Sequence, residues 1–93
     1  MNEELIHVRK EIARIDEQIF LLISKRFESS RKIGELKKHH GFAVENSAIE
    51  IEIYERNNLL GLTLGFDSNF SRQLSEILIH QSKNIQQKIL NAK

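Results

Sequence analysis

Apolar residues recur in steps of three and four from Leu5 to Leu22 and again at Ile33 and Leu36, with no proline among the first forty positions. The stripe comprises Leu5, Val8, Ile12, Ile15, Ile19, Leu22, Ile33 and Leu36. This heptad-like spacing predicts one helix over residues 5–39, because nothing breaks the pattern before Gly41 and proline is absent. At about 1.5 Å per residue, the helix would be roughly 50 Å long. The rest of a 93-residue monomer cannot cover such a helix, so we expect it to pack against a second copy of itself.

A second helix is predicted after a short connector over residues 41–45. Asn46 or Ser47 can cap it, and Glu50 is placed for a capping-box contact to Ser47. Its expected end is near Leu60, because Gly61 follows. The alternation of apolar and acidic residues over 49–53 would also suit a strand, but there is no second strand to pair with it.

A third helix is predicted after a turn over residues 61–66. Asp67 or Ser68 can cap it, and the helix frays near Asn91. Its expected apolar side consists of Phe70, Leu74, Ile77, Leu78, Ile85 and Ile89. We therefore predict a single all-α domain over residues 1–93, with three helices in each protomer.

The composition narrows the class of protein. The absence of Cys excludes disulfides and thiolate zinc sites, and adjacent His39 and His40 would point about 100° apart on a helix, so we expect no metal site. A net charge of +1 argues against a general nucleic-acid or membrane-surface binder. No apolar run approaches the roughly 20 residues of a membrane span, and the acidic start over residues 1–4 is unlike a signal peptide. We expect a cytoplasmic protein.

Three cations lie where the core side of the first helix is expected. At about 100° per residue from Ile12, Arg9 falls near +60°, Arg26 near −40° and Lys37 near −20°. A charge on a buried face is unfavourable unless it is paired. Each cation could instead reach solvent or pair with an acid such as Asp16. The alternative that we favour is an internal pocket for an anion with two negative groups, held by arginine–carboxylate contacts.

The spacing of these cations indicates a site shared between two chains. Arg9 and Arg26 are 17 positions apart, which is roughly 25 Å along one helix, so they cannot hold the same small molecule. An antiparallel copy of the helix, crossing near residue 20, would bring Arg9 of the partner subunit close to Arg26 and Lys37. We therefore expect a two-fold homodimer with composite sites.

The later helices offer polar partners for such a pocket. Asn46 and Glu50 lie on one side of the second helix, and Ser82 and Gln86 flank the apolar side of the third. Taken singly, Ser82 and Gln86 are typical boundary residues, and Glu50 could serve only as a helix cap. Together with the three cations, these residues suit a small, polyfunctional dicarboxylate.

An ordered series of apolar and polar residues runs through all three predicted helices. It begins as Val8-Arg9-x-x-Ile12-x-x-Ile15-Asp16-x-x-Ile19-x-x-Leu22-Ile23-x-x-Arg26, continues as Ile33-Gly34-x-x-Lys37 and ends as Ile79-x-x-Ser82-x-x-x-Gln86. This series, which spans nearly the whole chain, resembles the all-helical (type II) chorismate mutases. The resemblance implies an intertwined all-α homodimer with two active sites. It also implies an isomerase of the shikimate pathway, in aromatic amino acid biosynthesis, that converts chorismate to prephenate by a Claisen rearrangement without a cofactor.

The resemblance implies a catalytic role for four residues. Arg26 and, from the other protomer, Arg9 would hold the substrate carboxylates and so fold the side chain over the ring. Lys37 and Gln86 would donate to the ether oxygen, where negative charge grows as the C–O bond breaks. A pericyclic reaction of this kind needs no acid, base or nucleophile.

The second predicted helix departs from the family pattern. The resemblance implies that Glu50 binds the ring hydroxyl and that Ser82 supplies a further hydroxyl, with Asn46 also in the substrate site. The family often has Asp-x-x-Arg-Glu where this chain has Asn46-x-x-Ile49-Glu50, so an acid and a cation are missing. Two related activities therefore stay open, an isochorismate–pyruvate lyase and a 4-amino-4-deoxychorismate mutase.

Two further alternatives have no active site. A non-enzymatic helical dimer would keep the apolar stripe but would not need Lys37 or Gln86. A helix-turn-helix DNA-binding protein should have a basic recognition helix, but the third predicted helix, taken as far as Gln87, carries only Arg72 and Lys83 as cations. We therefore predict a chorismate mutase that binds its dicarboxylate substrate in a homodimer.

Overall fold

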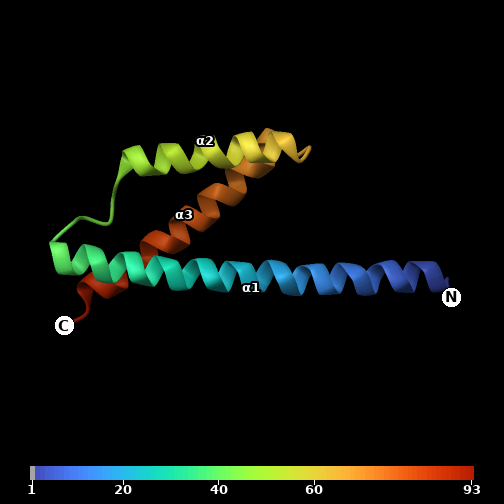
Figure 1. Ribbon diagram of the computed structural model, residues 1–93, viewed down its shortest axis with the longest axis horizontal. Helices are drawn as coiled ribbons and strands as arrows, with labels where there is room; N and C mark the ends of the chain where they lie inside the picture. Colours follow the sequence, from blue (N-terminus) through green and yellow to red (C-terminus); the bar gives the residue numbers. More distant parts are fainter. Residues whose placement is uncertain (1) are drawn as a thin grey trace.

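The computed structural model describes residues 2–93, which form three α-helices. They are α1 (Glu3–His40), α2 (Ser47–Thr63) and α3 (Ser68–Asn91). α3 runs between the other two and packs against both, whereas α1 and α2 do not pack against each other within the described range (Figure 1). The all-α prediction is confirmed, and the alternating segment at residues 49–53 is helical.

α1 is a single uninterrupted helix, and both of its ends are capped. The Asn2 side-chain oxygen accepts a hydrogen bond from the Leu5 N–H at 3.0 Å. At the other end, Gly41 adopts a left-handed conformation (φ 71°, ψ 27°) and its N–H donates to the Lys37 carbonyl. The 38-residue helix spans about 57 Å, close to the 58 Å longest dimension of the chain.

α2 begins as predicted but ends later. The Asn46 side-chain oxygen accepts from the Ile49 N–H at 3.2 Å and caps the helix. The predicted end before Gly61 is wrong, because α2 continues to Thr63. Gly61 is buried against α3, where a Cβ atom would overlap the Ser71 hydroxyl and lie 3.1 Å from the Ser71 Cβ. This glycine therefore allows two helices to approach closely and does not end one.

The buried side of α3 is not the one that the apolar pattern indicated. Its buried residues are Ser71, Ser75, Ile79, Ser82 and Gln86, spaced three or four apart along one face. On the predicted core side, Phe70, Leu74 and Ile77 are 51%, 38% and 60% exposed, whereas Leu78, Ile85 and Ile89 are half-buried. Small side chains fit where α3 is enclosed by two helices, so the larger apolar groups lie around the rim. Hydrogen bonds satisfy this polar seam in part: Asn57 donates to Ser75 at 3.0 Å.

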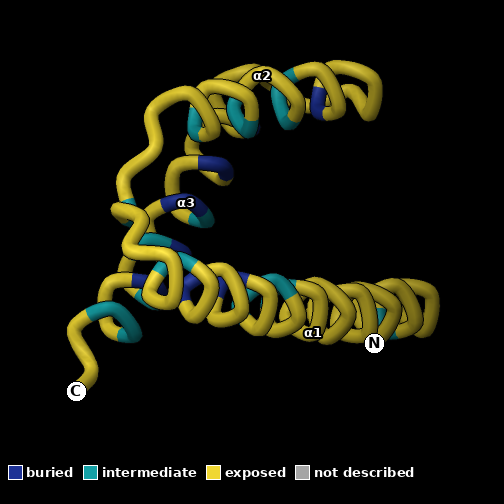
Figure 2. Tube along the Cα trace, turned by 60° about the vertical axis from the view of Figure 1, so that its left-hand side comes forward, coloured by how far each residue is buried: buried dark blue, intermediate teal, exposed yellow. Residues whose placement is uncertain are grey.

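The N-terminal half of α1 extends away from the other helices and is exposed over most of its length (Figure 2). Its apolar stripe is between 47% and 62% exposed at Leu5, Val8, Ile12, Ile15, Ile19 and Leu22. Within residues 2–93, Ile79 is the only buried large apolar side chain. No described helix combines the length and the apolar composition that crossing a membrane requires. The stripe is therefore a large apolar surface that the chain itself does not cover.

Candidate active site

Two adjoining hollows between the three helices bring together most of the predicted site residues. Both are lined by Arg26, Lys37, Asn46, Ser82 and Gln86. The larger has a volume of about 440 Å³. We call these hollows together the three-helix cavity. It joins residues that lie up to sixty positions apart in the sequence, because α3 crosses the C-terminal half of α1 (Figure 1).

The two α1 cations of the cavity are held by different neighbours. Arg26 Nη1 donates to the Ser82 hydroxyl at 2.5 Å and to the Leu78 carbonyl at 3.2 Å, both on α3. Lys37 Nζ donates to the Val44 carbonyl at 2.8 Å, in the connector between α1 and α2. Both side chains are half-buried rather than extended into solvent. The helix crossing therefore orients Arg26, and the connector orients Lys37.

A second guanidinium, that of Arg56 on α2, lines the same cavity. The pKa of Arg26 is lowered, first because burial removes water from its charge and second because Arg56 carries a like charge. Sequence reasoning missed Arg56, although it falls about 60° from Ile53 on the helical wheel, as close as Glu50 does on the other side. The cavity is therefore electropositive and suited to a ligand with more than one negative group.

Ser82 and Gln86 lie at the bottom of the cavity, on the buried side of α3. The Ser30 hydroxyl donates to Ser82 at 2.8 Å, and the Ser82 hydroxyl also accepts the hydrogen bond from Arg26. Gln86 is only 6% exposed, and its side-chain oxygen has no hydrogen-bond partner among the described residues. A buried amide without a partner calls for a ligand or water, and turning the amide presents either its oxygen or its N–H group.

Glu50 borders the smaller hollow and faces Lys83 of α3. Its carboxylate lies 3.4 Å from Lys83 Nζ, which also lies 2.9 Å from the Glu45 carboxylate. The hydrogen bond from Lys83 lowers the pKa of Glu45. The predicted capping-box contact from Glu50 to Ser47 is wrong, because Asn46 caps α2 and the Glu50 carboxylate lies beside Lys83 of α3 instead.

Arg9 is the one predicted site residue that does not border the cavity of its own chain. It is exposed on the extended half of α1, 17 residues before Arg26, and that distance is about 25 Å along the helix. Within one protomer, the two arginines are thus separated as the sequence predicted.

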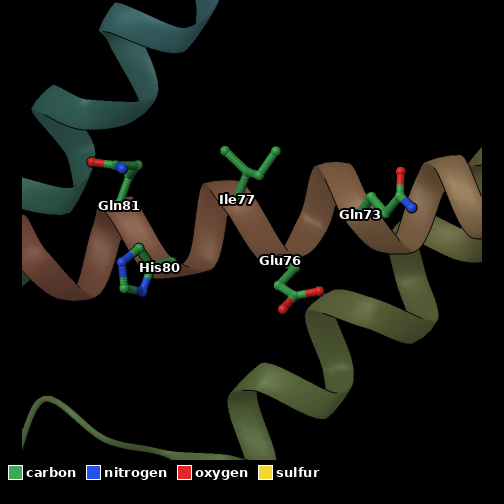
Figure 3. A pocket seen from close by; sticks show the side chains of 5 residues that line it. All are labelled: Gln73, Glu76, Ile77, His80 and Gln81. Carbon is green, nitrogen blue, oxygen red and sulfur yellow. The ribbon is translucent and has the colours of Figure 1, made fainter.

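Another hollow of about 440 Å³ lies beside α3. Figure 3 shows that its five lining side chains all come from α3 and project on both sides of the helix. They are Gln73, Glu76, Ile77, His80 and Gln81. This lining contains an acid and no Lys or Arg, so its charge does not suit a dianion. Volume does not distinguish this hollow from the larger hollow of the three-helix cavity. Charge and burial favour the three-helix cavity as the ligand site.

A comparison with protein families identifies the family of the chain. Residues 8–87 match the model of the family described as chorismate mutase type II. The chain belongs to this family. The match includes every residue of the three-helix cavity and also Arg9, and it confirms the resemblance and the all-α class that the sequence indicated.

One curated relative adds to this finding. The bifunctional chorismate mutase/prephenate dehydratase of Aquifex aeolicus (strain VF5) is 41% identical over 54 residues, which are 58% of this chain. The aligned part is 15% of that relative's length. The chorismate mutase type II chain thus matches only a small part of that bifunctional relative.

Proposed function

We propose that the protein is a chorismate mutase that converts chorismate to prephenate in the three-helix cavity. The observation that carries this proposal is the convergence of Arg26, Lys37, Ser82 and Gln86 on one hollow. Family membership and the similarity to a bifunctional chorismate mutase support the same reaction. The substrate is a dicarboxylate, which suits the positive charge of this cavity.

Arg26 binds one substrate carboxylate in this proposal. Its Nη1 atom is occupied by Ser82 and Leu78, so the rest of the guanidinium is free for a ligand within the described part of the chain. The bonds to α3 fix the direction of the side chain before substrate arrives. Such preorganisation favours the folded conformation in which the two reacting carbon atoms are close.

Lys37 and Gln86 donate to the ether oxygen in this proposal. As the bond between this oxygen and the ring breaks, a carbon–carbon bond forms at the other end of the enolpyruvyl group, and negative charge grows on the oxygen. A lysine ammonium and an amide N–H aimed at that atom would stabilise the transition state more than the substrate. The half-buried Lys37 and the unpartnered amide of Gln86 are suited to this task.

The second-helix residues favour chorismate over the 4-amino analogue. The Asn46 oxygen already accepts from the Ile49 N–H, so its NH2 group is the part left for a ligand. The Glu50 carboxylate is shared with Lys83. An amine substituent would need acceptors that are already engaged, whereas a hydroxyl can both donate and accept.

We also propose that the active form is a homodimer with composite sites, in which Arg9 of the partner subunit completes each cavity. The exposed apolar stripe of α1 supports this, because burying it against a second copy would remove it from water. Light scattering after gel filtration should give twice the 10.9 kDa mass of the chain. A monomer that is fully active would contradict composite sites.

The function is tested by incubating the purified protein separately with chorismate, isochorismate and 4-amino-4-deoxychorismate. Chromatography and mass spectrometry then identify the products. We expect prephenate from chorismate, lost in Lys37→Ala and kept in Lys32→Ala, a control on the solvent side of α1. Pyruvate released from isochorismate, or turnover of the amino analogue alone, would replace the proposed activity with one of its relatives.

A further inference from the structure

Arg56 is the only Lys or Arg on α2, and its charge is not matched by a neighbour. No ion pair within residues 2–93 includes it, and its side chain makes one weak hydrogen bond, from Nε to the Asn57 oxygen at 3.5 Å. Glu52, one turn earlier, borders the same cavity but does not pair with it. Arg56 is thus a cation beside a cavity without a fixed anionic partner.

The position of Arg56 relates it to the other cavity cations. Arg26 on α1 and Arg56 on α2 line the same hollow of about 440 Å³ from different helices. The like charge of Arg56 helps to lower the pKa of Arg26. Two guanidinium groups that repel each other across a cavity both gain from an anion placed between them.

The neighbouring residues of α2 offer no other cation to this hollow. Asn46, Ile49, Glu52 and Ile53 are the remaining α2-side residues that line it. Arg56 therefore supplies all of the positive charge that α2 brings to the cavity. Because Ile49 lies seven residues earlier, about two turns along the same face, a cation there would point into the same hollow.

We infer that Arg56 is a further substrate-binding residue, whose guanidinium binds a carboxylate of the dianion from the α2 side while Arg26 binds from α1. This inference rests on the proposed function for the identity of the ligand. It assigns Arg56 to binding of the ground state and not to the ether oxygen, because the proposed donors to that oxygen, Lys37 and Gln86, come from α1 and α3 and not from α2.

The test compares Arg56→Gln and Arg56→Lys with Arg72→Gln, a control that removes an exposed arginine of α3 outside the cavity. Steady-state kinetics with chorismate gives KM and kcat, and calorimetry gives the Kd of prephenate, a dicarboxylate that does not require turnover. For Arg56→Gln we expect KM and Kd to rise about 10- to 100-fold, which is the effect of losing one hydrogen bond to a charged group. We expect kcat to change less than about threefold, since Arg56 would bind the substrate and the transition state equally well.

The other variants make the test specific. Arg56→Lys should recover part of the affinity, and Arg72→Gln should leave KM and Kd unchanged. Adding Ile49→Arg to Arg56→Gln should also recover affinity, because it returns a guanidinium to the same wall. An Arg56→Gln protein with the melting temperature of the wild type and a Kd within twofold of it would overturn the inference.

The two proposals can fail separately. If the wild type binds prephenate in an Arg56-dependent way but converts none of the three substrates, the proposed function falls and the binding role of Arg56 stands. If the wild type converts chorismate with the same KM in Arg56→Gln, the function stands and the inference falls. A wild type that neither reacts with chorismate nor binds prephenate would overturn both.

Discussion

Gly34 of α1 lies directly against the backbone of α3 at Gln86. A Cβ atom at Gly34 would be 3.2 Å from the Gln86 Cα and 3.1 Å from the Cδ1 atom of Ile89. Both distances are shorter than ordinary van der Waals contact. The missing side chain at Gly34 therefore sets the spacing of the two helices and, with it, the depth at which Gln86 enters the cavity.

Gly34→Val should damage both stability and activity. The branched side chain would push α3 away from α1, which we expect to lower the free energy of unfolding by about 1–3 kcal/mol. It would also withdraw Gln86 from the ligand, so kcat should fall. Urea denaturation and steady-state kinetics check the two effects, with Gly41→Asn, at a left-handed position that Asn tolerates, as the control. Unchanged kcat in a stable Gly34→Val protein would separate Gln86 from catalysis.

Lys37→Ala should lower kcat about 10²- to 10³-fold, since it removes a donor from the developing negative charge. The loss of the bond from Lys37 to the Val44 carbonyl should loosen the connector but leave the three helices folded. Circular dichroism tests the fold, and a continuous assay of chorismate consumption tests the rate. Turnover at the wild-type level would remove Lys37 from the mechanism.

Arg9→Ala and Arg26→Ala proteins should each be inactive and should regain activity when mixed. A mixed dimer has one site with both arginines and one site with neither. With random exchange, half of the dimers are mixed, so about a quarter of the wild-type activity should return. Subunit exchange is monitored by native mass spectrometry. Complete exchange without any recovery would contradict the composite site.

Gly61→Ala should destabilise the contact between α2 and α3, because its methyl group would overlap the Ser71 hydroxyl. We expect a loss of about 1–3 kcal/mol in the free energy of unfolding. Ser71→Ala alone should be nearly neutral, since this buried hydroxyl has no hydrogen-bond partner in the described structure. A double-mutant cycle by urea denaturation should show that Ser71→Ala relieves part of the Gly61→Ala loss. If the effects of the two substitutions are additive, the destabilisation by Gly61→Ala does not come from overlap with the Ser71 hydroxyl.

The helices themselves could be predicted because their signals are local. An uninterrupted apolar stripe gave α1, and the side chains of Asn46 and Asp67 marked the starts of α2 and α3. Gly61 predicts a helix end that the structure does not have, because glycine is favoured both after a helix end and where two helices touch. Only the position of Ser71, ten residues later, distinguishes these two uses of glycine.

The buried side of α3 could not be predicted from apolar periodicity. Ser75, which is 1% exposed, is buried more completely than any large apolar residue of the helix. Its partner Asn57 is distant in the sequence, and so is the Ser30 that meets Ser82. Ser75 and Ser82 are thus enclosed where another helix supplies a hydrogen-bond partner, which depends on how the helices cross and not on the residue type.

The sequence pattern predicts residues that the structure brings together, while their roles stay a prediction. Arg26, Lys37, Asn46, Ser82 and Gln86 do border one cavity. Arg56 is not among the predicted residues, because an arginine on the flank of a single helix also suits a solvent-exposed position. The pairing of Glu50 with Lys83 depends on the distance between α2 and α3, which no single-helix pattern contains.

The extended half of α1 makes the proposed homodimer sensitive to its own abundance. Because its apolar stripe is exposed in a single chain, association would stabilise the folded state by mass action, and the melting temperature should rise with protein concentration. At low copy number, separated chains would carry incomplete sites and a long unprotected helix, which is a favourable target for proteolysis. Catalytic capacity would then rise more steeply than the amount of protein, so that small changes in expression give large changes in flux.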